Sequence, residues 1–392
     1  MDGTGLQAPL GPVSPSARQL KLFDECESQA EEDPAFLSEQ LITYIGNKRS
    51  LLPFLAGPIE RVKRRIGARR MVCADLFAGS GVVARYLKQH SSLLLVNDLE
   101  AYSRVTNACY LSNRSEVNLR DVAQAMDEVR VCIQADWRPG FITELYAPQD
   151  ESNITTCDRV FYSRRNATYL DAARRAIGRL PTETQKYLLA PLVAKASVHA
   201  NTSGVFKGFY KNKDGIGQFG GSGRDALVRI LGEIELALPV LSRFECAMEL
   251  YQDDANALVD RIPEVDLAYL DPPYNQHPYG SNYFMLNLLV DYQRPVEISR
   301  VSGIPTDWNR SRYNQRREAE QALFDLVERL RAKYVMISYN CEGFIKKDRF
   351  LEVLGRCGRV DKMDMTYNAF RGSRNLRGRP LHVTESLYLV EK

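Results

Sequence analysis

The chain has 392 residues, of which 44% are hydrophobic and 26% are charged, a composition typical of a globular protein with one large domain or two smaller ones. The 52 basic and 49 acidic side chains give a net charge of +3, which is too small to indicate a polyanionic partner by itself. No apolar run approaches the length of a membrane span, and the N-terminus lacks the pattern of a secretion signal, so we expect a cytoplasmic protein with no membrane association. The eight cysteines include no C-x-x-C pair, and the sequence predicts neither a metal site nor a disulfide framework.

The first 35 residues combine glycine, proline and serine with a cluster of acidic side chains and few apolar residues. Such a segment buries too little apolar surface to offset the entropy cost of ordering, so we predict a disordered tail over residues 1–35. From residue 36 onward, short apolar runs alternate with helical patterns, which predicts an α/β fold built on a parallel sheet. The predicted elements are the strands Met71–Phe77, Leu93–Val96, Ala247–Tyr251, Leu267–Leu270, Tyr334–Ser338 and Ser386–Val390, and the amphipathic helix Glu318–Arg331.

Helical periodicity replaces the strand pattern over the middle of the chain. The helical stretches are Val122–Val131, Tyr169–Leu180, Thr182–His199 and Asp225–Leu238, interrupted by the glycine-rich loop Gly204–Gly223. The sequence therefore predicts a discontinuous α/β domain, residues 36–114 and 244–392, with a mainly helical lobe of residues 115–243 inserted into it.

A glycine-rich turn follows the first predicted strand, running from Asp75 through Gly79 to Gly81. Glycines let backbone approach a ligand closely, and the N-terminus of the helix that follows offers free N–H groups. The P-loop consensus is absent, and Ala84 replaces the third glycine of the dinucleotide fingerprint, which disfavours NAD. Asp98, at the end of the next predicted strand, is placed to accept hydrogen bonds from ribose hydroxyls. Together these features predict a site for an adenosine-containing cofactor.

A second motif, Asp271-Pro272-Pro273-Tyr274, directly follows the predicted strand Leu267–Leu270. Consecutive prolines cannot continue a sheet ladder or enter a helix interior, so they fix a stiff turn at the carboxyl end of this strand. Ligand sites of open α/β sheets lie at that edge. A bare Asp-Pro-Pro sequence is more often a surface turn, and it is the combination with the upstream glycine turn that predicts an active site.

Residues 75–81 and 271–274 together resemble the motifs of class I S-adenosylmethionine-dependent methyltransferases that modify amino groups. The segment Thr43–Lys48, followed by Leu51 and Leu52, resembles the N-terminal cofactor motif of the Dam-like, alpha-group DNA adenine-N6 methyltransferases. The order of the motifs agrees with that group, including the large insertion before residue 271. The tract Tyr269–Leu286 resembles the form found in type II restriction-modification methylases, and the family's closing motifs are resembled by Tyr334–Asn340 and Val383–Leu387.

This resemblance implies a fold and a reaction. The fold is the class I methyltransferase (Rossmann-like) α/β fold, a mostly parallel seven-stranded sheet flanked by helices, with the inserted helical lobe as the target-recognition region. The reaction is transfer of a methyl group from S-adenosylmethionine to the exocyclic amine of an adenine flipped out of double-stranded DNA. The enzyme would serve as the modification enzyme of a restriction-modification system, with a cognate restriction endonuclease as functional partner and with no metal.

The resemblance also implies roles for individual residues. The catalytic residues are Asp271, Pro272, Pro273 and Tyr274: the Asp271 carboxylate and the Pro272 carbonyl accept the N–H bonds of the amine, and Tyr274 stacks on the flipped base. The cofactor-binding residues are Tyr44, Lys48, Asp75, Phe77, Gly79, Gly81, Asp98, Asp254 and Asp271. Two assignments stay open, because Lys48 fits either the cofactor carboxylate or the target base, and Asp253 competes with Asp254.

Basic side chains are interleaved with aromatic ones in several places. They are Arg159, Arg164 and Arg165 beside Phe161 and Tyr162; Lys207, Lys211 and Lys213 beside Phe206, Phe209 and Tyr210; Arg310, Arg312, Arg316 and Arg317 beside Trp308; and Arg371, Arg374, Arg377 and Arg379. Such side chains neutralise phosphates, and the glycine-rich loop has the composition of a mobile element that enters a DNA groove. We expect DNA contacts from Arg164, Arg165, Lys207, Lys211 and Lys213, and also from Tyr279 and Tyr283, which either line or brace the base pocket.

Alternatives within and outside this class remain. The chain has His277-Pro278 and Asn287 where similar methylases often carry Arg-Gln and glutamate, and these departures affect the expected target sequence more than the reaction type. An rRNA adenine methyltransferase, a DNA cytosine-N4 methyltransferase and a non-catalytic nucleic-acid-binding protein on the same fold are the competing interpretations. The four histidines, which we expect at surface or capping positions, are His90, His199, His277 and His382.

Overall fold

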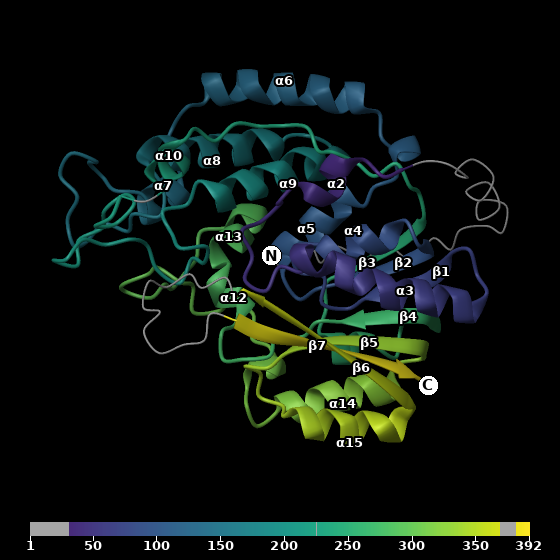
Figure 1. Cartoon of the computed structure of the whole chain (residues 1–392). Coiled ribbons are helices and arrows are strands. Elements are labelled where there is room, and N and C mark those ends of the chain that lie inside the picture. Colours follow the sequence, from purple (N-terminus) through teal and green to yellow (C-terminus); the bar gives the residue numbers. More distant parts are fainter. Residues whose placement is uncertain (1–30, 225, 369–381) are drawn as a thin grey trace, which may run out of the picture.

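A seven-stranded sheet runs through the part of the chain that the structure describes (Figure 1). The computed structural model describes residues 31–224, 226–368 and 382–392. The sheet order is β3-β2-β1-β4-β5-β7-β6, formed by β1 (Met71–Asp75), β2 (Ser91–Asn97), β3 (Ala247–Tyr251), β4 (Val265–Leu270), β5 (Ala332–Asn340), β6 (Arg359–Asn368) and β7 (His382–Glu391). Strands β1 to β5 pair in parallel, whereas β7 runs antiparallel between β5 and β6. The prediction of a mostly parallel sheet with the class I methyltransferase architecture is confirmed.

The sheet is covered by helices on both faces. Successive side chains of a strand point to opposite faces, so Cys73 and Tyr269 face one helical layer while Ala74 and Leu270 face the other. The first layer contains α3 (Leu52–Ile66) and α4 (Val82–Lys88), and the second contains α11 (Ala255–Leu258), α14 (Ala319–Arg329) and α15 (Lys347–Cys357). The central strands are therefore buried on both sides, which explains why they appear in the sequence as continuous apolar runs.

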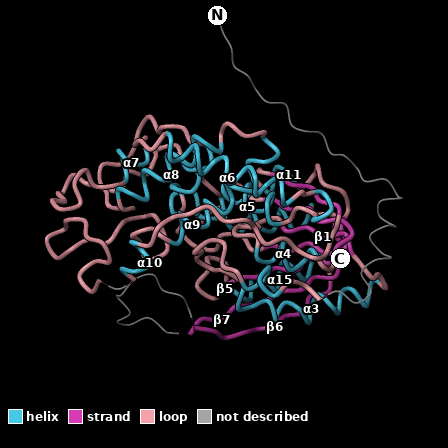
Figure 2. Tube along the Cα trace, turned by 90° about the horizontal axis from the view of Figure 1, so that it is seen from above, coloured by secondary structure: helices cyan, strands magenta, loops and turns pink. Residues whose placement is uncertain are grey.

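A mainly helical segment lies between β2 and β3 in the chain. Its helices are α6 (Leu119–Ala135), α7 (Phe141–Tyr146), α8 (Arg164–Ile177), α9 (Thr182–Val198) and α10 (Leu227–Leu231). Helix α9 packs on α5 (Ala101–Tyr110) and α13 (Phe284–Asp291), so the lobe shares a hydrophobic core with helices of the catalytic half. Loops gather at one end of the molecule, beyond α7 and α10 (Figure 2). The remaining elements are α2 (Pro34–Ser38), α12 (Tyr279–Asn282) and the 3₁₀ turns η1 (Arg49–Leu51), η2 (Arg114–Glu116) and η3 (Arg312–Asn314).

The predicted helix Asp225–Leu238 is wrong, because only Leu227–Leu231 is helical. Side chains of α8 take the backbone hydrogen bonds that a longer helix would need. Asn166 donates to the Gly232 carbonyl and accepts from the Ile234 N–H, and the Tyr169 hydroxyl accepts from the Leu236 N–H. The backbone after residue 231 is therefore held extended along α8.

Two other differences concern the ends of the chain. Residues 31–35 belong to the fold, because Asp33 caps α2 and the Glu32 carboxylate accepts hydrogen bonds from Ser242 and the Arg243 N–H. The rest of the predicted tail, residues 1–30, lies outside the described residues. Strand β6 has no counterpart among the predicted strands because it is an edge strand, whose partly exposed sequence lacks an apolar run. No helix in the described ranges has the length and apolarity needed to cross a membrane.

Candidate active site

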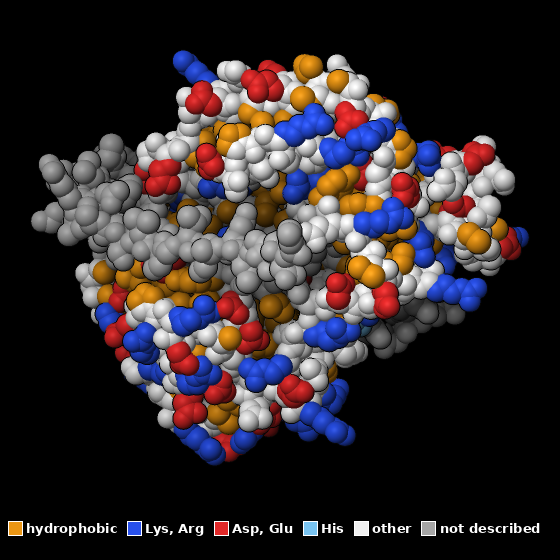
Figure 3. All heavy atoms as spheres, turned by 180° about the vertical axis from the view of Figure 1, so that it is seen from behind, with side chains coloured by type: hydrophobic (Ala, Val, Ile, Leu, Met, Phe, Trp, Pro, Cys, Tyr) orange, Lys and Arg blue, Asp and Glu red, His pale blue; other side chains and the backbone are white. Residues whose placement is uncertain are grey.

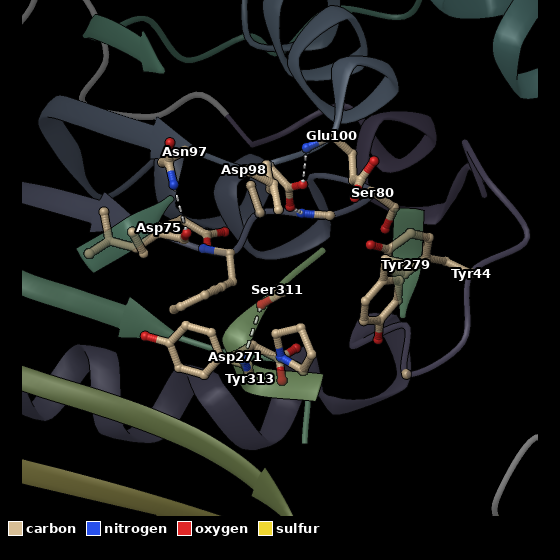
Figure 4. A pocket seen from close by; sticks show the side chains of 18 of the residues that line it. Tyr44, Asp75, Ser80, Asn97, Asp98, Glu100, Asp271, Tyr279, Ser311 and Tyr313 are labelled. Atoms are coloured by element: carbon tan, nitrogen blue, oxygen red, sulfur yellow. Dashed lines mark hydrogen bonds between the residues drawn. The ribbon is translucent and has the colours of Figure 1, made fainter. Parts of the chain in front are cut away.

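The glycine turn and the Asp-Pro-Pro-Tyr motif meet at the carboxyl edge of the sheet. Strands β1 and β4 pair so that Asp75 lies opposite Tyr269, two residues before Asp271. Both segments line one cavity at this edge. Figure 4 shows Asp75, Asp98 and Glu100 on one side of this cavity and Asp271 and Tyr313 on the other. The two motifs that the sequence singled out are therefore brought together at the edge where they were expected.

The glycine turn has a conformation that side chains disfavour. Gly79 and Gly81 have φ angles of +53° and +78°, and a Cβ on Gly81 would lie 2.4 Å from Asn107 Oδ1. The Asp98 carboxylate holds the turn, since the Gly79 N–H donates to Oδ2 at 2.7 Å and the Glu100 N–H donates to Oδ1 at 2.9 Å. Burial raises the pKa of Asp98 to about 6, although these N–H donors oppose the shift. Asp98 thus shapes the turn as well as lining the cavity.

The cavity is strongly acidic. Of its described lining residues, six are acidic (Asp75, Asp98, Glu100, Asp253, Asp254 and Asp271) and Lys48 is the single basic one. Asp75 Oδ2 is buried and has no hydrogen-bond partner among the described residues, and burial, with the nearby Asp271 charge, raises the pKa of this carboxyl well above its usual value. Asp254 caps α11 by accepting from the N–H groups of Asn256 and Ala257. Such a lining suits a cationic ligand with hydroxyl groups and disfavours a pyrophosphate.

A stack of tyrosines forms one wall of the site. The rings of Tyr44, Tyr279 and Tyr283 pack against one another with nearly parallel planes, and the ring centroids are 5.0 Å (Tyr44–Tyr279), 4.8 Å (Tyr44–Tyr283) and 6.0 Å (Tyr279–Tyr283) apart. The Ile45 N–H donates to the Tyr283 hydroxyl, and the Tyr279 hydroxyl donates to the Ile45 carbonyl. Tyr283 is 0% exposed, so the expectation that it contacts DNA is wrong for this structure: its ring braces the N-terminal segment. Tyr279 lines the cavity beside Gly46.

Lys48 lies under the catalytic motif. Its Nζ is 3.0 Å from Asp271 Oδ1 and 3.1 Å from Glu385 Oε1. Burial alone would lower the pKa of Lys48, but Asp271 and then Glu385 outweigh burial and hold it well above its usual value. Burial raises the pKa of Asp271 to about 6, against the opposing effect of Lys48. The structure thus places Lys48 beside the Asp271 carboxylate.

Two contacts fix the position of Tyr274, which follows β4 at the same edge of the sheet. Its ring meets that of Tyr339 edge-on at 6.1 Å, and its carbonyl accepts a hydrogen bond from the Phe344 N–H. Phe77, at the other end of the cavity, meets Tyr313 edge-on at 5.0 Å. The proline turn and the glycine turn are thus each supported by a tyrosine that lies far away in the sequence.

Several lining residues were missed by the sequence analysis. Asn309, Ser311, Tyr313 and Asn314 all line the cavity from the segment between α13 and α14. Asn309 and Asn287 both donate to Glu100 Oε2, at 3.1 and 2.6 Å. Asn287, one of the departures from the type II pattern, therefore helps to fix a carboxylate of the cavity wall. The segment of residues 305–318 has no helical or strand periodicity that would have indicated this role.

Some of the basic residues predicted to contact DNA are exposed, and at least one is engaged in an ion pair. Lys207, Lys211 and Lys213 are exposed, whereas Arg165 forms an ion pair with Glu233 at 2.6 Å. Three of the neighbouring aromatic rings, those of Phe161, Tyr162 and Phe206, are buried in the core of the lobe and so are not available for bases, whereas Phe209 and Tyr210 are half-buried. Asn201 holds the glycine-rich loop by bonding Gly220 N–H and the carbonyls of Val160 and Gln218. On the face shown in Figure 3, basic and acidic side chains are intermixed, notably over its lower part.

His90, His199 and His277 are not among the residues that line this cavity. His90 is buried, which contradicts the expected surface or capping position, and burial lowers its pKa to about 4. His199 Nδ1 pairs with the Arg229 carbonyl at 2.7 Å, His277 is exposed, and the side chain of His382 lies outside the described residues, as do Arg371, Arg374, Arg377 and Arg379. Within the described ranges, no group of three His, Cys, Asp or Glu side chains is arranged to hold a metal ion.

Comparison with known proteins assigns the family. The family model for D12 class N6 adenine-specific DNA methyltransferases matches residues 44–297, which include the N-terminal tyrosine segment, the glycine turn and the Asp-Pro-Pro-Tyr motif. The type II methyltransferase M.NlaIII of Neisseria lactamica is 29% identical over 362 residues, covering 90% of this chain and 99% of that protein. M.CviAII of Paramecium bursaria Chlorella virus 1 is 27% identical over 358 residues, covering 89% and 98%. M.FokI of Planomicrobium okeanokoites is 24% identical over 368 residues, which cover 52% of that longer protein. The chain belongs to the D12 class N6 adenine-specific DNA methyltransferase family.

Proposed function

We propose that this chain is a site-specific DNA adenine-N6 methyltransferase that uses S-adenosylmethionine and acts as the modification enzyme of a restriction-modification system. Family membership supplies the reaction class. One observation in the structure links this reaction to particular residues: Asp271 and the Gly79 turn line the same acidic cavity.

The cavity fits S-adenosylmethionine. This molecule carries positive charge and ribose hydroxyls, and the cavity offers several carboxylates, including the unpartnered Asp75 Oδ2. We assign Phe77, Gly79 and Gly81 to its methionine and ribose portions, Asp98 to the ribose and Asp254 to the adenine end. When bound, it supplies an electrophilic methyl group on a positively charged sulfur.

The Asp-Pro-Pro-Tyr motif would position the target amine. Lys48 occupies Asp271 Oδ1, while the Asp271 side chain keeps 19% of its surface exposed, which leaves Oδ2 to accept one N–H of the amine. The Pro272 carbonyl accepts the second N–H, and the Tyr274 ring stacks on the base. The nitrogen lone pair then forms the new C–N bond as the S–C bond breaks with its electrons staying on sulfur, and the nitrogen releases one proton. Such positioning supplies roughly 7 to 11 kcal/mol of a barrier in favourable cases.

The DNA side of the proposal rests on exposed basic residues. Lys207, Lys211 and Lys213 project from the glycine-rich loop, which is tied to the catalytic half because the Phe206 N–H donates to the Asn282 carbonyl in α12. We assign these lysines to phosphates of double-stranded DNA, together with Arg164 and Arg165 at the start of α8. M.NlaIII and M.CviAII are named as type II methyltransferases, which supports a cognate endonuclease as the functional partner.

The test is transfer of tritiated methyl from S-adenosylmethionine to unmethylated double-stranded DNA and, in parallel, to ribosomal RNA, followed by nucleoside analysis. The proposal requires N6-methyladenine in DNA, and it requires that Asp271→Ala abolish transfer while cofactor binding persists. Asp260→Asn, a surface change on an exposed ion pair with Arg329, serves as the matched control and keeps full activity. Label in RNA or at N4 of cytosine, or an active Asp271→Ala enzyme, would refute the proposal.

A further inference from the structure

A buried cluster of one lysine and two carboxylates underlies the catalytic motif. Lys48 bridges Asp271 and Glu385, and the exposed fractions of the Lys48 and Glu385 side chains are 4% and 2%. Glu385 lies on β7, outside the residues matched by the family model, and no role follows for it from the motifs.

Glu385 is held in a fixed orientation. Ser338 Oγ donates to its Oε1 at 2.6 Å, and Asn340 Nδ2 donates to its Oε2 at 3.2 Å. Both partners lie on β5, which pairs with β7 so that Asn340 is opposite Glu385. Since the carboxylate is fixed by two rigid neighbouring strands, it also fixes the Lys48 ammonium, whose own segment has little regular structure.

The net charge of this cluster is unusual for a group of residues that only stabilises the fold. One carboxylate is enough to balance a buried lysine, and a second buried carboxylate carries a desolvation penalty of several kcal/mol. The Lys48 charge, together with bonds from Ser338 and Asn340, keeps the pKa of Glu385 below its usual value although burial opposes this. With Asp271 also ionised, the cluster has a net charge of −1 directly beneath the position of the target amine.

We propose that Glu385 is a positioning residue for methyl transfer, acting through Lys48 on the Asp271 carboxylate. The inference rests on the proposed function. Glu385 holds Lys48 where it occupies Asp271 Oδ1, so that Oδ2 is aimed at the amine. The extra negative charge stabilises the positive charge that develops on the amine nitrogen as its lone pair forms the bond to the methyl carbon, before the nitrogen releases its proton.

Glu385→Gln is the central variant, because it keeps the side-chain volume and removes the charge. We expect kcat to fall on the order of 100-fold, the scale of a misplaced reacting group, with the KM for DNA and the Kd for S-adenosylmethionine nearly unchanged. Glu385→Asp keeps the charge and should retain more activity than Glu385→Gln. Glu391→Gln is the control on the same strand: like Glu385, Glu391 pairs with a basic residue, here Arg65, and it accepts a further hydrogen bond from the Tyr334 hydroxyl, but it lies at the opposite end of the strand.

A pH profile separates positioning from a general loss of structure. The Glu385 charge raises the pKa of Asp271, so Glu385→Gln should move the acid limb of kcat to lower pH. Besides Glu385 itself, the charged or titratable groups around Asp271, which must stay in place for this comparison, are Lys48, Asp75, Tyr269, Tyr274 and Tyr279. A kcat loss with an unmoved acid limb would indicate a purely structural role and overturn the inference.

Activity of the wild-type enzyme separates failure of the proposed function from failure of the role assigned to Glu385. If wild-type enzyme makes no N6-methyladenine, the proposed function fails and this inference fails with it. If wild-type enzyme is active and Glu385→Gln matches its kcat, or loses only cofactor or DNA affinity, the inference alone is overturned. If Glu385→Gln does not fold, Glu385→Asp and Ser338→Ala are measured instead: reduced kcat with wild-type circular dichroism and cofactor affinity supports the inference, and wild-type kcat in both overturns it.

Discussion

Replacing Lys48 with methionine removes the buried cation that bridges the Asp271 and Glu385 carboxylates while keeping most of the side-chain volume. Lys48 is 4% exposed and lies within 3.1 Å of both Asp271 and Glu385. Breaking a buried ion pair by removing one partner costs about 3 to 5 kcal/mol, because the remaining charge is left uncompensated. We therefore expect the free energy of unfolding of Lys48→Met to fall by about 3 to 5 kcal/mol at pH 8.

The size of this loss should depend on pH. In the wild type, burial raises the pKa of Asp271 to about 6 while Lys48 opposes the shift. Without Lys48 that opposition disappears, so the pKa rises further above its unfolded value of about 3.9. The folded variant then binds more protons than its unfolded chain between these values, and its stability increases as pH falls. The deficit relative to the wild type should be largest above the folded pKa and should shrink towards pH 5.5.

Urea unfolding followed by circular dichroism at pH 8 and pH 5.5 measures both quantities. Lys333→Met is the matched control, since Lys333 pairs with Asp266 at 2.7 Å but is 53% exposed, and an exposed pair contributes little. We expect this control to lose much less stability at pH 8 than Lys48→Met. Equal losses in the two variants, or a Lys48→Met deficit that grows towards acid pH, would refute the reasoning about the buried cluster.

Three further predictions follow from the cavity and its surroundings. Gly79→Val should weaken S-adenosylmethionine binding, measured by calorimetry, about tenfold or more. The φ of +53° at residue 79 is disfavoured for a side chain by about 1 to 2 kcal/mol, and the new Cβ would lie 2.9 Å from Tyr44. Gly57→Ala is the control, because its Cβ meets open space, and it should leave the binding unchanged. The kcat should fall about tenfold per pH unit below about pH 6, where Asp271 becomes protonated, and a flat profile to pH 5 would contradict its role as an acceptor. Lys211→Glu should raise the KM for DNA at unchanged kcat and reduce the salt dependence of binding by about one phosphate contact, whereas an unchanged salt slope would remove Lys211 from the interface.

The parts of the fold that could be predicted are those in which local sequence and tertiary environment agree. Buried parallel strands such as Leu267–Leu270 have continuous apolar sequences, and the turns after β1 and β4 need residues with special backbone geometry. The predicted helix Asp225–Leu238 was wrong because the Ile234 and Leu236 N–H groups donate to the side chains of Asn166 and Tyr169, which are 68 and 67 residues away in the chain and hold that backbone extended. No local pattern contains such information.

The candidate site also has features that the local sequence could predict and features that it could not. The two motifs of the active site were recognisable because each combines a special turn with the end of a strand. Local composition was a poor guide where basic and aromatic residues alternate. Phe161 and Phe206 are core residues of the lobe, although basic residues lie beside them in the sequence. Glu385 and Asn309 could not be assigned, because their roles depend on partners in other elements: Lys48 for one and Glu100 for the other.

The N-terminal segment of residues 44–48 connects the two halves of the active site. Tyr44 packs against Gly79 in the glycine turn and stacks on Tyr279 and Tyr283, which follow the catalytic motif. Four residues later, Lys48 contacts Asp271 itself. A five-residue segment therefore touches the cofactor turn, the aromatic wall and the catalytic carboxylate at once. Packing through this one segment therefore joins the turn assigned to the proposed cofactor and the Asp271 carboxylate, which are far apart in the sequence.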